Sequence, residues 1–271
     1  MAYAARGHRP HPKPMLHTLT ATALCCSLLS CSAVAAQTRQ ILTEDFRDMH
    51  NRPHAVLDFL AVEPGWTVLD LLAGDGYWSQ HLAQRVGTQG KVFAHNNQTY
   101  ATFTAALSRR LTKTPAPQIE VYVRELDDIL LPSGSVDMVL MANVYHDVYF
   151  VGNGWRVSAD RLFALLQRIL RPGGVLAIID HKAASASGIA AVARLHRIDP
   201  EFVLADLAAR GFHLEATSDL LHNPNDDLSL PVFAADVRGM TSRFVYRFVK
   251  PRQPSGLYLN PSGRCYSTTA W

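Results

Sequence analysis

The stretch VLDLLAGDGYWSQHLAQRVGTQGKVFAHNN, residues 68–97, contains an apolar strand, a glycine loop, a helix and a second strand. Glycines in such a loop let the backbone approach a ligand closely and adopt unusual φ angles. The loop also directs backbone N–H groups and a helix N-terminus toward that ligand. This arrangement predicts a site for part of a nucleotide, although the second strand ends in His95-Asn96-Asn97 and supplies no acid.

Strands and helices continue to alternate after this stretch. We predict apolar strands at 68–72, 92–95, 119–123, 136–142 and 175–180, and helices at 77–86, 101–111, 161–170 and 201–210. This alternation predicts an α/β fold with a parallel sheet and helices on both faces. Two further strands are expected in FHLEATSDLL and SRFVYRFVKP, and the last of them is expected to be antiparallel.

Composition divides the chain into four segments. Residues 1–36 combine a basic stretch, an apolar run and terminal small residues, which predicts an export signal that is cleaved. LLSC within this leader also fits a lipoprotein signal with Cys31 lipidated, and a retained anchor or a start at Met15 are further alternatives. We expect a helical segment at 37–64, including a helix from Pro53 to Pro64-Gly65, then one domain at 65–250 and a flexible tail at 251–271.

The charged residues and cysteines exclude several classes of protein. The leader carries three basic residues and no acid, while 23 basic residues balance 23 acidic ones in the remainder. This balance argues against nucleic acid as a partner, because nucleic-acid binding favours clustered Lys and Arg. Three of the four cysteines lie in the leader, so the chain outside it has no cysteine set for a disulfide framework or a cysteine zinc site.

Asp70, Gly74 and Gly76 form the pattern D-x-x-x-G-x-G. This pattern resembles the first motif of the class I S-adenosylmethionine-dependent methyltransferases. LDDILLPSGSVDMVLM (126–141) resembles the D-x-x-x-L-P segment and fourth strand of that family, and RILRPGGVLAIIDH (168–181) resembles its turn into the fifth strand. The resemblance implies a Rossmann-like, doubly wound, mostly parallel seven-stranded sheet with an antiparallel strand near the C-terminus.

A narrower resemblance concerns bacterial methyltransferases with export leaders. They share the motifs Y-H-D, D-H and H-R-I-D, which stand here at residues 145–147, 180–181 and 196–199. Family membership implies S-adenosyl-L-methionine as the cofactor and methyl donor. It leaves the acceptor unidentified, and we expect a small-molecule substrate.

The resemblance also implies roles for individual residues. Gly74 and Gly76 would let the loop pass under the methionine part of the donor, and Asp70 would orient the loop and the ammonium group. Asp127 would accept a hydrogen bond from the adenine amine, with the adjacent Asp128 as a competitor. Asn143, at the end of the fourth strand, completes the predicted cofactor-binding residues together with a ribose ligand.

The predicted ribose ligand departs from the family pattern. Methyltransferases of this class usually place Glu or Asp at the end of the second strand, whereas this chain has Asn96 and Asn97. An asparagine carbonyl accepts such a hydrogen bond, but a charge-assisted bond is about twice as strong. We therefore predict Asn96 as a weaker ribose ligand.

The predicted catalytic residues follow the fourth and fifth strands. Methyl transfer is an in-line displacement that needs alignment and, where a proton leaves, a base. His146 is the predicted general base because an unperturbed histidine titrates near neutral pH, and Asp147 would orient it. His181 is the competing base, and Tyr145 would pack against the substrate or the methionine.

Two alternatives to this catalytic reading stay open. In one, the same side chains only hold loops together by hydrogen bonds. In the other, Asp147, Asp180 and His181 hold a divalent cation, with His196 beyond them. The chain has no compact H-x-x-x-H or C-x-x-C pattern, so we predict a site without metal.

The leading prediction is a methyltransferase that is periplasmic or envelope-associated, and cytoplasmic if the leader does not function. Contact with a membrane would come only through the leader or a lipid on Cys31. S-adenosylmethionine is made in the cytosol, so an exported enzyme would lack its donor. The alternative is therefore a non-catalytic envelope protein that keeps the fold as a ligand- or partner-binding module. A nicotinamide-dependent oxidoreductase is disfavoured because Ser79 replaces the third glycine of the dinucleotide fingerprint.

Overall fold

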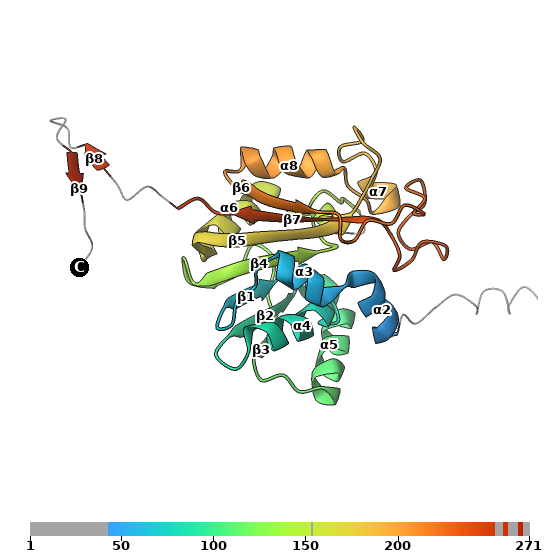
Figure 1. The fold of residues 1–271 in the computed structure, drawn as a ribbon, viewed down its shortest axis with the longest axis horizontal. Helices are drawn as coiled ribbons and strands as arrows, with labels where there is room; N and C mark the ends of the chain where they lie inside the picture. The colour runs from blue at the N-terminus through green and yellow to red at the C-terminus, as the bar shows by residue number, and fades with distance from the viewer. Residues whose placement is uncertain (1–42, 153, 253–256, 260–264, 268–271) are drawn as a thin grey trace, which may run out of the picture. The chain divides into compact units, whose positions relative to one another are not determined.

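A computed structural model describes residues 43–152, 154–252, 257–259 and 265–267 of the chain (Figure 1). The helices are α2 (Glu44–Asn51), α3 (Pro53–Phe59), α4 (Tyr77–Val86), α5 (Ala101–Lys113), α6 (Ala159–Ile169), α7 (Val192–Leu195) and α8 (Pro200–Ala209), with the 3-10 turns η1 (Gln98–Tyr100) and η2 (His146–Val148). The strands are β1 (Thr67–Asp70), β2 (Lys91–Asn96), β3 (Ile119–Val123), β4 (Val136–Ala142), β5 (Leu170–His181), β6 (His213–Ser218), β7 (Arg243–Val249), β8 (Leu257–Leu259) and β9 (Cys265–Ser267).

Seven of these strands form one sheet in the order β3-β2-β1-β4-β5-β7-β6. Strands β1 to β5 are parallel, and β7 is antiparallel to both β5 and β6. This topology confirms the predicted fold class. The order of strands reverses between β1 and β4, and ligands of open α/β sheets bind at such a switch point, outside the carboxyl ends of the strands.

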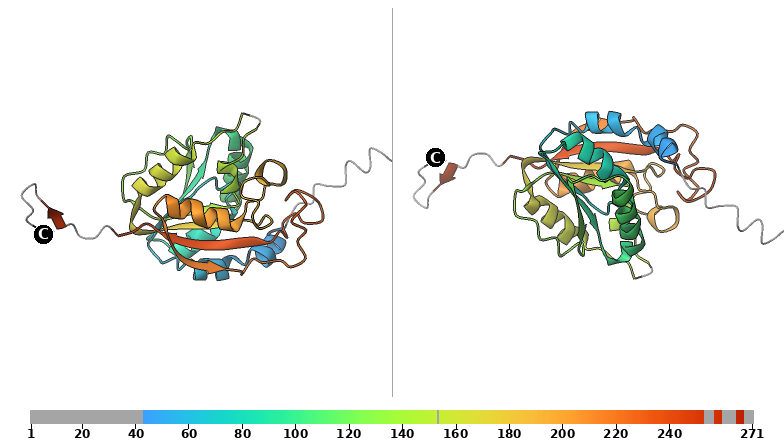
Figure 2. Two further views of the ribbon diagram at one scale, coloured as in Figure 1. Left: turned by 90° about the horizontal axis from the view of Figure 1, so that it is seen from above. Right: turned by 90° about the horizontal axis from the view of Figure 1, so that it is seen from below.

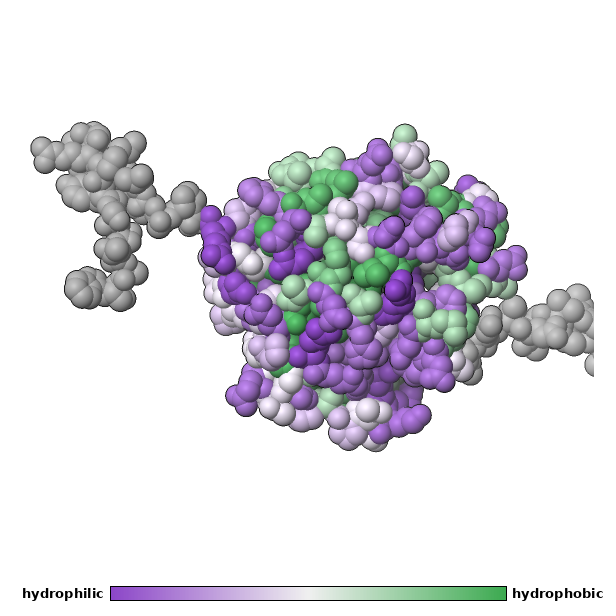
Figure 3. Space-filling view, in the orientation of Figure 1, coloured by the Kyte–Doolittle hydropathy of each residue, from purple (hydrophilic) through white to green (hydrophobic). Residues whose placement is uncertain are grey.

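Alternating side chains of the central strands fill two cores, one on each face of the sheet. On one face Leu69 and Val139 pack with α6 and α8, and on the other Val68 and Leu140 pack with α3 and α4. Figure 2 shows α6 and α8 on the opposite side of the sheet from α3. Full burial of one such side chain contributes about 1.5–3 kcal/mol, and burial of both faces explains why these strands are continuous apolar runs in the sequence. The outer surface over α4 and α5 is mainly hydrophilic (Figure 3).

The segment before β1 contains two helices joined at Arg52. Arg52 has a left-handed φ of 44°, and Pro53 begins α3. Helix α3 buries Val56 and Leu57 in the core that it shares with α4, whereas α2 buries no residue. Figure 1 places α2 at the carboxyl end of the parallel strands. This helix therefore lies beside the edge of the sheet where a ligand is expected.

The chain continues at both ends beyond the residues that form the seven-stranded sheet. The predicted leader, including Cys31, lies outside the described residues. None of the helices that the structure describes is long and apolar enough to cross a lipid bilayer. Within the predicted tail, β8 and β9 pair as an antiparallel hairpin.

Candidate active site

The glycine loop after β1 lines the larger of the two cavities that border the loops after β1 to β4. Gly74 has a φ of 60° and Gly76 a φ of 77°, in the left-handed region that costs other residues about 1–2 kcal/mol. Gly74 lines a cavity of about 270 Å³, whose other walls come from α2, the end of β4 and the segment before β7. Gly76 lies against α5, where an added Cβ would be 2.3 Å from Leu107 Cδ1. Gly74 therefore leaves space for the cavity, whereas Gly76 lets α5 pack closely against the N-terminus of α4.

Asp70 connects the end of β1 to the first turn of α4. Its side chain is buried, and its Oδ2 accepts a hydrogen bond of 2.6 Å from the Ser79 hydroxyl. Ser79 is the residue that replaces the third glycine of a dinucleotide fingerprint, so this departure provides the partner of Asp70. Burial raises the pKa of Asp70 to about 7, although the Ser79 hydrogen bond acts in the opposite direction. The structure thus places Asp70 behind the loop that it was predicted to orient.

The raised pKa of Asp70 predicts a pH-dependent stability. The folded chain binds the Asp70 proton more tightly than the unfolded chain, so this contribution is complete below about pH 4 and is lost as the pH rises through about 7. Relative to Asp70→Asn, the wild-type free energy of unfolding should fall by about 1.4 kcal/mol per pH unit across this range. Urea denaturation from pH 4.5 to 8 measures the difference. The exposed Asp219→Asn variant should follow the wild-type curve, and a parallel curve for Asp70→Asn would contradict the prediction.

The last two residues of β2, His95 and Asn96, bind the backbone at the glycine loop. The Asn96 side chain accepts from Gly74 N at 3.0 Å and donates to Gly74 O at 2.9 Å, and Asn96 is fully buried. His95 Nδ1 accepts from Leu72 N at 3.3 Å, which leaves Nε2–H to donate to Arg124 O at 3.0 Å. Burial lowers the pKa of His95 to about 4, so the ring is neutral at neutral pH. Asn96, the predicted ribose ligand, therefore lies behind the loop with its amide fully used.

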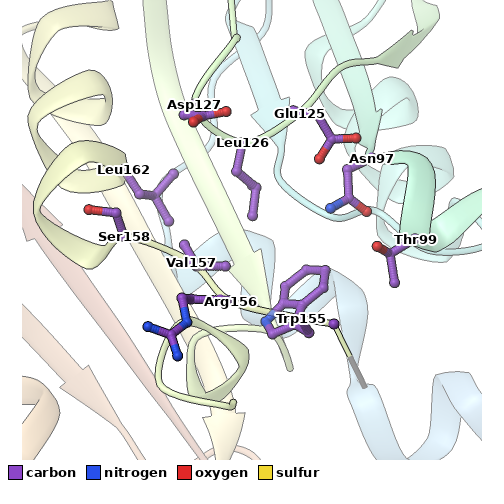
Figure 4. Close-up of a pocket in the computed structure, with 11 residues that line it drawn as sticks. Asn97, Thr99, Glu125, Leu126, Asp127, Trp155, Arg156, Val157, Ser158 and Leu162 are labelled. Atoms are coloured by element: carbon purple, nitrogen blue, oxygen red, sulfur yellow. The ribbon is translucent and has the colours of Figure 1, made fainter. Parts of the chain in front are cut away.

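A second cavity, of about 140 Å³, lies beside the loops that follow β2 and β3. Asn97, Glu125 and Asp127 line it, together with Trp155 (Figure 4). The adjacent Asp128 does not line this cavity and forms an ion pair of 3.2 Å with Arg124, whereas Asp127 lines it and is 4.0 Å from Arg161. Glu125, which the sequence did not single out, supplies a carboxylate on the same side as Asn97.

Aromatic side chains lie where the two cavities approach each other. Tyr100 lines the larger cavity and Trp155 the smaller one, and their ring centroids are 5.9 Å apart. Tyr100 OH donates to Asp147 Oδ2 at 3.1 Å, and Trp155 Nε1 donates to Asp147 O at 2.7 Å. Asp147 therefore fixes both rings, rather than only orienting His146 as predicted.

Helix α2 is tied to the glycine loop by two arginines. Arg47 of α2 forms a bidentate pair with Asp75 at 2.7 and 3.1 Å, and Arg110 of α5 contacts the same carboxylate at 3.0 Å. Both arginines also bind Glu44. Burial alone would raise the pKa of Asp75, but the hydrogen bonds and charges of Arg47 and Arg110 hold this pKa below its ordinary value. This cluster closes the larger cavity on the α2 side.

His146 is held by a carboxylate at the end of β5. Asp180 accepts from His146 N at 2.7 Å and from His146 Nδ1 at 2.8 Å, and both side chains are buried. Burial disfavours the charged ring, yet Asp180 and Asp147 raise the pKa of His146 above its ordinary value. Tyr145 points into the core instead, where it is fully buried and its hydroxyl donates to Asp206 at 2.5 Å. The structure thus joins His146, Asp147 and Asp180 but separates Tyr145 from them.

His181 is the predicted catalytic histidine that lines the larger cavity. Its Nδ1 is 2.7 Å from Thr241 Oγ1, and the hydrogen bonds of the described residues leave its Nε2 without a partner. Burial, together with the charges of His146 and Arg243, lowers the pKa of His181 well below its ordinary value. The ring is therefore neutral, and its Nε2 is able to accept a hydrogen bond.

Two further polar groups beside this cavity lack complete hydrogen bonding among the described residues. Asn143, with a left-handed φ of 59°, has no partner for its buried Oδ1, and Arg243 has none for its buried Nε. Arg243 donates to Asn51 Oδ1 and to His50 O, and burial lowers its pKa to about 10. No role was predicted for Arg243, although it lies in RGMTSRFVYRF (238–248), a stretch that resembles the bacterial methyltransferases with export leaders.

The sheet order, the antiparallel β7 and the glycine loop after β1 define the fold of the class I methyltransferases. A family profile described as "Methyltransferase domain" matches residues 68–174, which include the loop and β1 to β4. Residues 68–174 therefore match a methyltransferase domain, and the fold is that of the class I methyltransferases, as the motifs predicted; the narrower resemblance to proteins with export leaders stays a prediction. No curated protein matches the chain in sequence.

Solved structures share this fold at low sequence identity. A SAM-dependent methyltransferase from Aquifex aeolicus is 22% identical with a TM-score of 0.55, and the match covers 73% of this chain and 89% of that one. The [4+2]-cyclase SpnF is 14% identical with a TM-score of 0.53 and coverages of 75% and 81%. A SAM-dependent O-methyltransferase from Thermotoga maritima is 17% identical with a TM-score of 0.50 and coverages of 76% and 67%. These similarities concern the fold alone.

Proposed function

We propose that the protein is an S-adenosylmethionine-dependent methyltransferase acting on a small molecule. The observation that carries the proposal is the glycine loop at the carboxyl end of β1, with Gly74 facing a cavity and a second, acid-lined cavity beyond it. A donor with a methionine end and an adenosine end requires two such neighbouring spaces. Both cavities lie near the switch point of the sheet, where α/β proteins bind ligands.

The residues that line the two cavities fit S-adenosylmethionine. The methionine end would lie in the larger cavity along Gly74, near Arg47 and Arg243, which offer positive charge for a carboxylate. The adenosine end would lie in the smaller cavity, with Asp127 toward the adenine amine and Glu125 toward the ribose hydroxyls. Glu125 thereby supplies the carboxylate that β2 lacks. The donor would contribute an activated methyl group on a sulfonium.

The acceptor side is formed by the walls of the larger cavity near β5 and β7. His181 Nε2 would accept a hydrogen bond from the acceptor, since Thr241 binds the other ring nitrogen. His146, the base predicted from the sequence, does not line this cavity and lies behind His181, with ring centroids 5.8 Å apart.

Calorimetric titration of the full chain with S-adenosylmethionine and S-adenosylhomocysteine tests the proposal. We expect micromolar binding that Asp127→Asn and Glu125→Gln each weaken about 10- to 100-fold, because hydrogen bonds to charged groups contribute about 1.5–3 kcal/mol. Asp128→Asn is the matched control, since Asp128 pairs with Arg124 and does not line the cavity. It should leave the affinity unchanged. Well-folded protein that binds neither ligand would overturn the proposal and favour the non-catalytic envelope protein.

Location and partners are proposed on the sequence alone. We propose export to the periplasm or envelope through the leader, and a small-molecule substrate as the partner, without nucleic acid. SpnF, a [4+2]-cyclase by name, shares the fold. The fold by itself therefore does not fix the reaction, and donor binding is the property that separates the enzyme from a binding module.

A further inference from the structure

Three side chains with metal-binding atoms converge between η2 and the end of α7. They are His146, Asp147 and His196, and one ligand atom of each lies within 4.8 Å of the other two. Asp147 Oδ1 is 3.3 Å from His146 Nε2 and 3.8 Å from His196 Nδ1. One carboxylate oxygen thus lies between two imidazole nitrogens.

Outer contacts orient two of these ligands. Asp180 is fully buried and accepts the Nδ1–H of His146, which directs the lone pair of Nε2 toward Asp147. Tyr100 binds Asp147 Oδ2 at 3.1 Å, which leaves Oδ1 facing the two histidines. Metal-binding histidines almost always donate their second ring nitrogen to a carboxylate, a carbonyl or water, and bound carboxylates are themselves hydrogen-bonded. The arrangement around His146 and Asp147 matches this pattern.

His196 reaches the cluster through a left-handed backbone conformation, and two phenylalanine rings contact its side chain. Its φ is 51°, and its ring stacks on Phe150 with centroids 5.0 Å apart. Phe233 meets the same ring edge-on, also at 5.0 Å. The His196 side chain is 24% exposed and that of Asp147 is 16% exposed, so the cluster is open to solvent on one side.

We propose that His146, Asp147 and His196 bind a divalent transition-metal ion of the Zn²⁺ or Fe²⁺ class. Two imidazoles and one carboxylate suit these ions, whereas Mg²⁺ and Ca²⁺ prefer oxygen ligands. Zinc lies about 2.0–2.2 Å from nitrogen and oxygen ligands, so ligand atoms around one ion are about 3–3.5 Å apart. The 3.3 Å separation already fits this range, and the 3.8 Å separation and the third one, which is at most 4.8 Å, require a shift of the partly exposed His196.

This ligand set differs from the cation site considered from the sequence. There, Asp180 and His181 were candidate ligands, but Asp180 is bonded to His146 and His181 Nδ1 to Thr241. None of the three ligands lines the larger cavity, so the ion lies outside the space that the proposed methyltransferase function assigns to the acceptor. The binding of the metal itself does not depend on that function.

Titration of the full, metal-depleted chain with Co²⁺ tests the site without any measurement of activity. We expect visible absorption bands from nitrogen and oxygen coordination, and displacement of Co²⁺ by Zn²⁺ with a micromolar or lower Kd. His196→Gln should weaken this binding at least 100-fold. Because His196 is partly exposed, this variant is expected to fold, and it separates the site from the other histidines of the chain.

His213→Gln, which changes an exposed histidine on β6, is the matched control and should bind like the wild type. A wild-type chain without Co²⁺ absorption bands, or a His196→Gln variant that keeps its affinity, would overturn the metal site. Donor titration remains an independent result. If the donor does not bind but the His196-dependent Co²⁺ bands are present, the metal site stands and the proposed function fails.

Discussion

Replacing Arg197 by methionine is expected to lower the free energy of unfolding by about 3–5 kcal/mol, because the change leaves a buried carboxylate without its charge partner. Arg197 donates to both oxygens of Asp226, at 2.7 and 2.8 Å, and both side chains are fully buried. Arg197 also donates to the carbonyl oxygens of Lys182 and Leu230. Urea denaturation of wild type and Arg197→Met, followed by circular dichroism, measures the loss.

The double variant Arg197→Met/Asp226→Asn is the control for the buried charge. After Asp226→Asn, the side chain keeps one oxygen that can still accept a hydrogen bond from Ser242 N. This N is 2.6 Å from Asp226 Oδ2 in the wild type. Removing the charge should therefore restore at least half of the lost stability. A loss below 1 kcal/mol in the single variant, or an equal loss in both variants, would show that the buried charge does not dominate.

This ion pair fixes the loop between β6 and β7 against the end of β5. Gly239 and Thr241, which line the larger cavity, belong to that loop. The motif H-R-I-D therefore combines three functions in four residues. His196 faces the proposed metal site, Arg197 holds the loop, and Asp199 caps α8 by accepting from Glu201 N.

The fold was predictable because its signals are local. Helix α4 occupies Tyr77–Val86 as predicted, since Gly76 and Gly87 bound it on both sides. Strand β5 begins at Leu170, five residues before the predicted start, because Leu170 pairs with Val136 before the register shifts. The helix predicted after Pro53 is α3, which ends at Phe59 rather than at Pro64, and α2 was predicted only as part of a helical segment at 37–64.

The site was less predictable because a sequence does not show which way a side chain points at the end of a strand. Asn96 and Asn97 are neighbours, yet Asn96 binds the loop backbone and Asn97 lines a cavity. Tyr145 and His146 are also neighbours, yet Tyr145 lies in the core against α8. Glu125 acquires its place only when the loops after β2 and β3 come together, and no local pattern marks that contact.

Gly76→Ala is expected to lower the free energy of unfolding by about 2–5 kcal/mol. A φ of 77° costs an alanine about 1–2 kcal/mol. The added Cβ would also be 2.3 Å from Leu107 Cδ1, inside the contact between α4 and α5, and overpacking of a core costs about 1–3 kcal/mol. Urea denaturation measures the sum of the two effects.

Gly74→Ala separates the backbone cost from the packing cost. Gly74 has a similar φ of 60°, but the nearest side-chain atom to an added Cβ, Phe103 Cδ1, is 4.0 Å away. This variant should therefore lose only about 1–2 kcal/mol. Its added methyl group occupies the wall of the larger cavity, so it should weaken donor binding more than Gly76→Ala does. Equal losses of stability in the two variants would show that Leu107 moves aside without cost and that only the left-handed backbone requires glycine.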